Sequence, residues 1–307
     1  MCKCLKKLLS IFKDDDEPHY EEEEQQEERD PMKKALLVGI NKYAPELNAD
    51  LRGCVNDVKA MRELLLGTYG FEPDNIRVVI DERATKQNII DRLRWLVADA
   101  RPGDELFFHY SGHGAQVRDR DGDELKDHLD EILCPHDLKW DDPLTDDFIG
   151  DLFDDLPAGV NLTMFCDSCH SGTMTRGQLL GFDKKPGKKD NKPRTISPPV
   201  DIASRFMDSK VNSKRKVGKG KKGEEVLNHV LISGCQDDQT SSDAYIGGKY
   251  QGAFTWAVTE VLKVKPNVTY DKLHEKVLTQ LNGKFTQVPN LSGPANMISR
   301  RVFGGSE

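Results

Sequence analysis

Two stretches of the chain decide its fold: residues 107–114 read FFHYSGHG, and residues 164–172 read MFCDSCHSG. Each is an apolar run that ends abruptly in small residues, with one reactive side chain at its end. A buried parallel strand delivers its last residues to the carboxyl edge of its sheet, where α/β proteins carry out their chemistry. We therefore expect His113 and Cys169 to lie at neighbouring strand ends. A thiol beside an imidazole is the minimum equipment for a cysteine nucleophile with a general acid–base partner.

The hydrophobic pattern of the whole chain predicts strands that alternate with helices. The predicted strands are residues 35–40, 76–80, 106–110, 162–166 and 230–232. The predicted helices are residues 57–69, 85–100, 145–156, 254–262 and 270–281, the second of them opened by Thr85. Alternation at this spacing implies right-handed crossovers. The predicted fold class is therefore α/β, with a mainly parallel central sheet flanked by helices.

The composition of the 307 residues indicates an acidic protein without a membrane span. Hydrophobic residues make up 37% of the chain, and no apolar run reaches the roughly 18 residues that a spanning helix needs. The formal net charge of -8 argues against nucleic acid as the main partner. Seven cysteines, an odd number without paired spacing, and no secretory signal predict free thiols in a reducing cytoplasm.

Composition also divides the chain into four parts. These are a mostly acidic, disordered leader (1–31), a large catalytic segment (32–172), a basic flexible linker (173–226), and a small segment that completes the same domain (227–307). The leader cannot bury enough apolar surface to order itself. Its Cys2 and Cys4, beside lysines, could hold an S-acyl chain at a membrane, but a solvated tail is the favoured interpretation.

Both reactive stretches resemble those of a known family. Residues 109–114 and 167–172 closely resemble the two catalytic motifs of the metacaspases, which are caspase-like cysteine peptidases. The similarity extends to residues 53–57, 118–124 and 233–241, so that it spans residues 33 to 304. The resemblance implies a caspase-like (caspase-hemoglobinase) fold, in which a larger and a smaller segment are joined by a linker.

The resemblance also implies a cysteine endopeptidase that cleaves peptide bonds after Arg or Lys. Cys169 would attack the carbonyl carbon, and His113 would protonate the departing amine. The main-chain N–H groups of Cys169 and Gly114 would hold the oxyanion. From the residues themselves, we expect a strand-to-helix turn after Cys169, whose N–H groups would stabilise the thiolate.

Acidic side chains would line the substrate pocket of such an enzyme. The matching positions are Asp57 and Asp167, with Cys54 and Ser111 nearby. A cationic substrate side chain forms charge-assisted hydrogen bonds with buried carboxylates, and an acidic one cannot. Without the resemblance, Asp57 could equally be a carboxylate in the first turn of a helix, and Asp167 a helix N-cap.

Calcium is the cofactor that the resemblance implies, since Asp130, Asp146 and Asp147 fall where the family's ligands lie. Carboxylate oxygens are the ligands that this cation prefers. A further aspartate is expected shortly after the nucleophile, but Arg176 stands in that stretch, which predicts weak binding. Residues 119–123 do not form an EF-hand, because their glycine comes two positions early. The alternative is that all these acids are merely solvated.

The basic linker gives a further prediction. Exposed flexible segments are preferred sites of proteolysis, and this one adjoins a pocket suited to Lys and Arg. We therefore expect self-processing between Arg176 and Lys222. A solvated charged loop or a polyanion-binding patch is the alternative.

Two other functions fit the pattern less well. A caspase-fold scaffold that binds partners with little turnover would not need both His113 and Cys169. An enzyme for acidic substrates is opposed by Asp57 and Asp167. The favoured prediction is a monomeric, cytoplasmic peptidase whose partners are proteins or peptides with Arg or Lys at the cleaved bond.

Overall fold

The computed structural model describes residues 29–118, 129–169, 191–199, 227–236, 239 and 241–305. The chain forms two units, residues 1–30 and 31–307, and every element named below belongs to the second. Several sequence predictions lie outside the described residues. They are most of the leader and of the linker, the acidic residues 119–123, the turn after Cys169, and Arg176.

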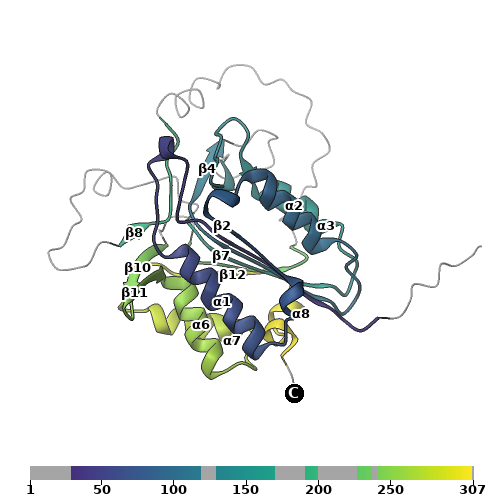
Figure 1. Cartoon of the computed structure of the whole chain (residues 1–307). Coiled ribbons are helices and arrows are strands. Elements are labelled where there is room, and N and C mark those ends of the chain that lie inside the picture. Colours follow the sequence, from purple (N-terminus) through teal and green to yellow (C-terminus); the bar gives the residue numbers. More distant parts are fainter. Residues whose placement is uncertain are drawn as a thin grey trace, which may run out of the picture. The chain divides into compact units, whose positions relative to one another are not determined.

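A six-stranded sheet forms the centre of the second unit (Figure 1). Its strand order is β12 (Asn290–Ser292), β9 (Val230–Ser233), β7 (Asn161–Asp167), β3 (Glu105–Ser111), β1 (Lys33–Gly39) and β2 (Ile76–Ile80). Neighbouring strands are parallel except for β12, which runs antiparallel to β9. The predicted α/β class with a mainly parallel central sheet is confirmed.

Helices cover both faces of this sheet (Figure 1). One face carries α1 (Cys54–Thr68), α6 (Ala253–Val264) and α7 (Tyr270–Leu281), and the other carries α2 (Lys86–Val97) and α3 (Asp146–Asp154). Successive side chains of a strand point to opposite faces, so β1 contributes Leu36 and Val38 to one apolar core and Ala35 and Leu37 to the other. A short helix, α8 (Ala295–Ile298), follows β12. Within the described ranges, no helix is long and apolar enough to cross a bilayer.

The strands and helices predicted from the hydrophobic pattern are all present, with ends that differ by a few residues. Thr85 opens α2 as predicted, because its Oγ1 accepts a hydrogen bond from the Asn88 N–H at 3.3 Å. Strong apolar periodicity was therefore a sufficient signal for the layers of the fold.

Two small antiparallel sheets were not predicted. One contains β4 (Gly114–Arg118), β5 (Leu129–Leu133) and β6 (Leu144–Thr145), and the other contains β11 (Lys249–Gly252), β10 (Ser242–Ile246) and β8 (Lys192–Pro193). Their strands are short, and several are too polar to show a clear period of two. β8 lies within the predicted linker, and both sheets contribute to the site described next.

Candidate active site

The two reactive stretches end side by side at the carboxyl edge of the central sheet. β3 and β7 are parallel neighbours, and their last residues, Ser111 and Asp167, pair in register. His113 and Cys169 each follow two residues later. Both residues are buried, with exposed fractions of 4% and 0%. The pairing of the strands therefore brings the imidazole and the thiol to one edge, away from bulk water.

A main-chain carbonyl orients the His113 ring. Nε2 lies 2.7 Å from the oxygen of Ala49, and because a carbonyl only accepts, Nε2 must carry the proton. Nδ1 is then the basic nitrogen of the neutral ring. Burial lowers the pKa of His113 to about 4, against the opposing effect of the Ala49 hydrogen bond. The ring is therefore neutral at pH 7 and can accept the proton of a thiol.

Two tyrosines hold the turn that carries His113. The Tyr43 hydroxyl accepts a hydrogen bond from the His113 N–H at 2.7 Å, and the Tyr110 hydroxyl donates to the His113 carbonyl at 2.7 Å. A Cβ atom at Gly112 would lie only 2.6 Å and 2.9 Å from the Tyr110 and Tyr43 hydroxyl oxygens. Only glycine therefore leaves room for this pair of hydrogen bonds.

The thiol of Cys169 is held by Ser241. The Ser241 N–H donates to Sγ at 2.5 Å, and Sγ donates to the Ser241 carbonyl at 3.4 Å. Burial raises the pKa of Cys169 well above its usual value, and hydrogen bonds with the main chain only partly oppose it. The sequence predicted a stabilised thiolate at Cys169. In this structure burial opposes that stabilisation, and the turn that was expected to provide it lies outside the described residues.

Arg194, from the segment predicted to be a linker, fills the predicted substrate pocket. Its side chain is completely buried. Nη1 lies 2.9 Å from Ser111 Oγ and 3.2 Å from Asp167 Oδ1. Nη2 lies 2.8 Å from Asp57 Oδ2 and 3.2 Å from Asp243 Oδ1. Three carboxylates thus surround one guanidinium, and Asp243 is the one that the sequence did not identify.

Donors from the protein hold two of these carboxylates in place. Asp57 accepts from the Gly252 N–H at 2.9 Å and from Ser111 Oγ at 2.8 Å. Asp167 accepts from Ser241 Oγ at 2.6 Å and from Thr255 N–H at 2.8 Å. Asp167 is the last residue of β7, and its carboxylate bonds to residues far away in the sequence.

Charge in the pocket is only partly balanced. Burial raises the pKa of Asp57 to about 6, while Arg194 lowers it and Asp167 raises it further. The pKa of Arg194 is raised: burial alone would lower it, but the surrounding carboxylates outweigh that effect. Cys54 is buried at the start of α1, where burial raises the pKa of its thiol and a hydrogen bond with Ser111 lowers it. The Arg194 guanidinium therefore stays charged in this pocket.

The carbonyl of Arg194 lies between two main-chain donors. Its oxygen accepts from the N–H groups of Gly114 at 3.0 Å and Cys169 at 3.1 Å. These are the same two groups that the resemblance names as holders of the oxyanion. The carbonyl of the Arg194–Thr195 peptide bond therefore lies beside Cys169, where the two predicted oxyanion donors converge.

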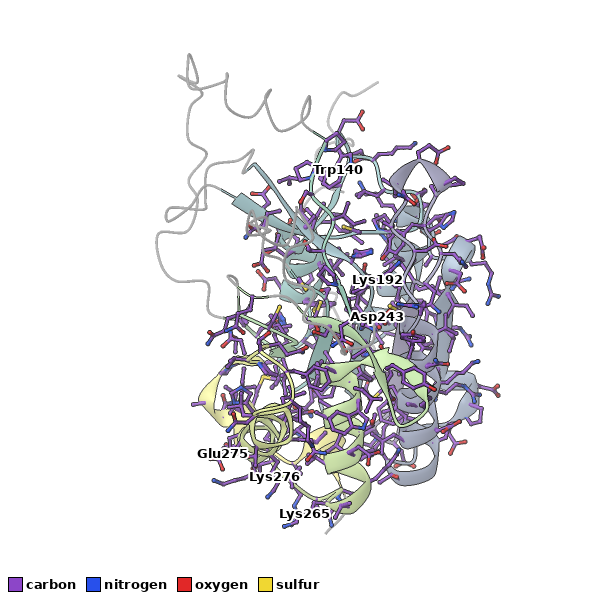
Figure 2. All side chains as sticks on the ribbon, turned by 90° about the vertical axis from the view of Figure 1, so that its left-hand side faces the viewer. Trp140, Lys192, Asp243, Lys265, Glu275 and Lys276 are labelled. Atoms are coloured by element: carbon purple, nitrogen blue, oxygen red, sulfur yellow. The ribbon has the colours of Figure 1, made fainter. Side chains whose placement is uncertain are left out.

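The chain on either side of Arg194 is bound as an extended strand. β8 pairs antiparallel with β10, so that Lys192 lies opposite Asp243, as Figure 2 shows. The Arg194 N–H donates to the Ser241 carbonyl at 3.0 Å, and beyond the bond the Ile196 N–H donates to Gly114 O at 3.2 Å. Main-chain hydrogen bonds thus fix the register of the peptide on both sides of the bond.

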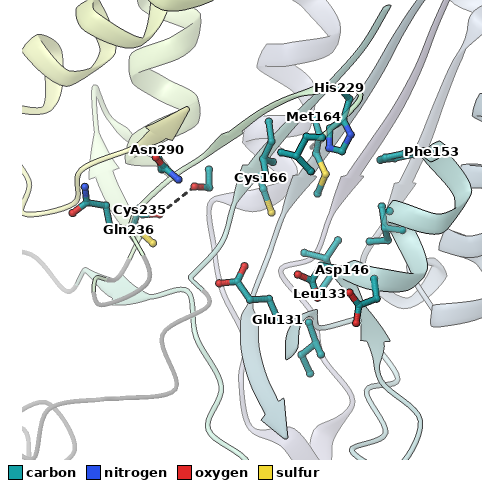
Figure 3. A pocket seen from close by; sticks show the side chains of 17 residues that line it. Glu131, Leu133, Asp146, Phe153, Met164, Cys166, His229, Cys235, Gln236 and Asn290 are labelled. Atoms are coloured by element: carbon teal, nitrogen blue, oxygen red, sulfur yellow. Dashed lines mark hydrogen bonds between the residues drawn. The ribbon is translucent and has the colours of Figure 1, made fainter. Parts of the chain in front are cut away.

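The predicted calcium ligands lie outside the pocket that holds Arg194. Asp130 is buried on β5, and Asp146 and Asp147 begin α3. Asp146, Asp147 and Glu131 line a cavity of about 170 Å³. Figure 3 shows Glu131 and Asp146 on one side of it, and Asn290 on another. Among the residues that the structure describes, no three His, Cys, Asp or Glu side chains are grouped to hold a metal ion.

Sequence reasoning missed two components of the site. Asp243 lies two positions after the stretch 233–241 that resembles the family, and this proximity was its only signal. Ala49 acts through its main-chain carbonyl. Because any residue type offers such a carbonyl, no sequence pattern could have identified it.

Comparisons with known proteins agree with each other. A family model described as "Metacaspase, peptidase C14 domain" matches residues 33–177. Metacaspase-1 of Sclerotinia sclerotiorum is 37% identical over 297 aligned positions, which cover 87% of this chain and 67% of that protein. Metacaspase-1 of Schizosaccharomyces pombe is 36% identical over 290 positions, with 85% and 67% covered. Among solved structures, protein GSU0716 from Geobacter sulfurreducens aligns with a TM-score of 0.65 at 26% identity, covering 90% of this chain and 100% of that chain.

Proposed function

The chain belongs to the metacaspase family of cysteine peptidases, and from that premise we propose that it is an endopeptidase cleaving after Arg or Lys through Cys169 and His113. One observation carries the proposal. A fully buried arginine, Arg194, contacts three carboxylates while its carbonyl oxygen accepts from the N–H groups of Gly114 and Cys169. A basic side chain and a reactive bond are thereby recognised together.

In the proposed mechanism, neutral His113 takes the proton of the Cys169 thiol as Sγ attacks the carbonyl carbon. Negative charge develops on the carbonyl oxygen, and the N–H groups of Gly114 and Cys169 stabilise it. His113 then gives its proton to the departing amine, which leaves a thioester on Cys169. A water molecule, deprotonated by His113, then attacks the thioester carbonyl; the C–S bond breaks, and His113 returns the proton to Cys169 Sγ. Ala49 keeps the ring in the tautomer that these steps need.

Charge supports the preference for a basic side chain. Asp57, Asp167 and Asp243 place three carboxylates in a pocket without access to water. An acidic substrate side chain would add a negative charge there with no donor to pair it, and unpaired buried charges are strongly unfavourable. The alternative of a caspase-fold scaffold with little turnover is disfavoured by the ordered pair His113 and Cys169.

We further propose that the enzyme cleaves its own Arg194–Thr195 bond. The bond lies within residues 176–222, where self-processing is expected, and its carbonyl lies beside Cys169, where the two predicted oxyanion donors converge. A cleaved chain would end in Arg194, whose side chain is fully enclosed. Activity on other proteins therefore requires this segment to leave the pocket.

Calcium is proposed as the stimulus for this self-cleavage. Asp130, Asp146 and Asp147 would hold it, and it would supply positive charge to the acids around α3. The cavity beside Asp146 and Asp147 supports this proposal, as does the preference of calcium for carboxylate oxygens. Arg176 should keep the affinity low.

We also propose that the enzyme is a cytoplasmic monomer. The cysteines that the structure describes, Cys54, Cys134, Cys166, Cys169 and Cys235, are all free and buried. Reducing compartments maintain free thiols. Sedimentation of the purified chain would test the monomeric state.

The direct test of the proposed activity uses three reporter peptides that differ only in an Arg, Lys or Asp before the cleaved bond. Cleavage of the Arg and Lys peptides and not of the Asp peptide is expected. Cleavage of the Asp peptide alone would contradict the specificity, and a complete lack of turnover by the folded protein with calcium present would favour the scaffold.

A further inference from the structure

We infer that Asp243 makes this pocket select arginine over lysine. The inference rests on the proposed cleavage after basic residues and goes further, because it assigns the choice between the two basic side chains to one carboxylate. Asp243 lies on β10, the strand that also pairs with the bound segment at Lys192. It therefore belongs to the same structure that binds the peptide main chain.

The two arms of the Arg194 guanidinium have separate partners. Nη1 bonds to Ser111 Oγ and to Asp167. Nη2 bonds to Asp57 and to Asp243. An arginine fork is rigid and planar, so it can satisfy two groups of acceptors at fixed positions at once. Each Nη nitrogen of the guanidinium thus bonds to its own pair of side chains in the pocket.

The three carboxylates differ in what holds them. Asp57 accepts from Gly252 and Ser111, and Asp167 accepts from Ser241 and Thr255, whichever side chain fills the pocket. Asp243 is different, since its Oδ2 accepts from the Arg52 N–H at 2.9 Å while Oδ1 is bonded, among the described residues, by Arg194 alone. Asp243 Oδ1 thus depends on the basic side chain in the pocket for a hydrogen-bond donor.

Lysine cannot supply that partner while satisfying the rest of the pocket. Its side chain carries one nitrogen, which would stand near the position of the arginine Cζ, one bond short of both Nη atoms. Its ammonium has three donors, but from the position of Cζ it lies one bond farther from Asp243 Oδ1, which Arg194 Nη2 itself reaches only at 3.2 Å. A lysine bonded to Asp57 and Asp167 therefore leaves Asp243 Oδ1 buried without a donor. A site built to hydrogen-bond a substrate group rejects the analogue that lacks it, because its own buried polar atom is left unpaired.

Packing keeps Asp243 from adjusting to a shorter side chain. A Cβ atom at Gly53 would collide with Asp243 Oδ1 and with the main chain of Gln251, so the carboxylate lies tightly against the start of α1. The Arg52 N–H fixes its second oxygen. The carboxylate therefore cannot readily turn toward a lysine nitrogen.

The test is a competition between two peptides in one tube. Both carry Lys-Pro before the variable position and Thr-Ile after it, as in residues 192–196, and the variable residue is Arg or Lys. The ratio of their depletion rates equals the ratio of kcat/KM, and it does not depend on how much enzyme is folded or how many pockets are vacant. For the wild type we expect at least a tenfold preference for the Arg peptide.

Asp243→Asn should reduce that ratio at least tenfold, mainly through loss of Arg turnover. The Asn side chain keeps an acceptor for the Arg52 N–H, and Asp243→Ser is a second variant should the first not fold. Two control variants separate a specific change in the Arg-to-Lys ratio from a general loss of activity. Asp91→Asn, an exposed carboxylate on α2, should leave the ratio unchanged, and Asp57→Asn should slow both peptides.

The outcomes are distinct. A wild-type ratio near one, or an unchanged ratio in an active Asp243 variant, would overturn the role of Asp243 while the peptidase proposal stood. Turnover of neither peptide by any protein would overturn the proposed function and this inference with it. A collapsed ratio in the Asp243 variants alone supports the inference.

Discussion

The carbonyl oxygen of Arg194 lies 3.1 Å from the main-chain nitrogen of Cys169, so the chain presents one of its own peptide bonds to its own candidate nucleophile. The same residue fills the acidic pocket with its guanidinium. The structure therefore represents a closed state, in which the site is assembled and occupied.

Replacing the nucleophile should abolish catalysis without unfolding the protein. In Cys169→Ala, cleavage of Arg and Lys reporters should fall by several orders of magnitude, because the attacking group is gone. A fluorescence assay of reporter cleavage would measure the loss of activity, and a thermal melting curve would show that the fold is retained. Cys134→Ala, which removes another buried thiol, is the matched control. Residual activity of Cys169→Ala above a tenth of the wild type would contradict the assignment.

Neutralising a pocket carboxylate should weaken the recognition of basic side chains. In Asp57→Asn or Asp167→Asn, kcat/KM for the Arg reporter should fall at least tenfold, which corresponds to about 1.4 kcal/mol. The amide keeps the size of the carboxylate but not its charge. Full activity in both variants would show that these two carboxylates do not bind the basic side chain of the substrate.

Emptying the pocket should activate the enzyme toward added substrate. In Arg194→Gln, the guanidinium no longer pairs with the carboxylates, so the segment should leave more readily and turnover of an Arg reporter should rise severalfold. Unpaired buried charges should also lower the free energy of unfolding, by about 3–5 kcal/mol if water does not enter. Lys192→Gln removes a neighbouring exposed charge and should have much smaller effects. An Arg194→Gln protein with unchanged turnover and stability would show that Arg194 does not block the pocket.

Acid should destabilise the fold in part through His229. Burial lowers the pKa of this residue to about 4, against the opposing effect of Asp154, from a usual value of 6.5. Between these values the unfolded chain binds more protons, so stability that is present above pH 6.5 is lost as the pH falls toward 4. At pH 5 the loss is about 2 kcal/mol at most.

Melting temperatures of His229→Gln and wild type at pH 7 and pH 5 would measure that contribution. The decrease in melting temperature from pH 7 to pH 5 should be smaller in His229→Gln than in the wild type. His274→Gln, at a half-buried histidine on α7, should show the wild-type drop. An equal drop in all three proteins would contradict the role of His229.

Calcium and self-cleavage should be coupled. Wild type should need millimolar calcium, because Arg176 stands in the stretch of sequence where a further aspartate ligand is expected, and Arg176→Asp should lower that requirement. Asp146→Ala combined with Asp147→Ala should block cleavage, since two carboxylates are lost from a hard-cation site. A calcium titration read by gel would test all three proteins. Full self-cleavage in chelator would show that these acids do not bind a required metal.

The central part of the fold could be predicted because it rests on local patterns. β3 and β7 are continuous apolar runs that end in small residues, and this pattern was enough to expect His113 and Cys169 at adjacent strand ends. What could not be predicted depends on pairing between distant segments. β8 is only Lys192–Pro193, and nothing in those two residues indicates a partner about fifty positions later.

The same reasoning explains the pocket. Asp57 and Asp167 could be named, because each lies beside a recognisable motif. The burial of Arg194 against them depends on where a polar segment returns to the fold, and a charged residue in such a segment ordinarily predicts exposure to solvent. Its pairing with three carboxylates is a property of the tertiary structure.

The central claim is that this peptidase cuts its own chain after Arg194. The most direct test is the intact mass of purified wild type, Cys169→Ala and Arg194→Gln after incubation with calcium. We predict that wild type yields fragments 1–194 and 195–307, with Thr195 as the new N-terminus. Cys169→Ala should stay whole, and Arg194→Gln should not be cut at this bond. Cleavage of Cys169→Ala at the same bond, or a folded wild type cut only at other bonds, would contradict the account.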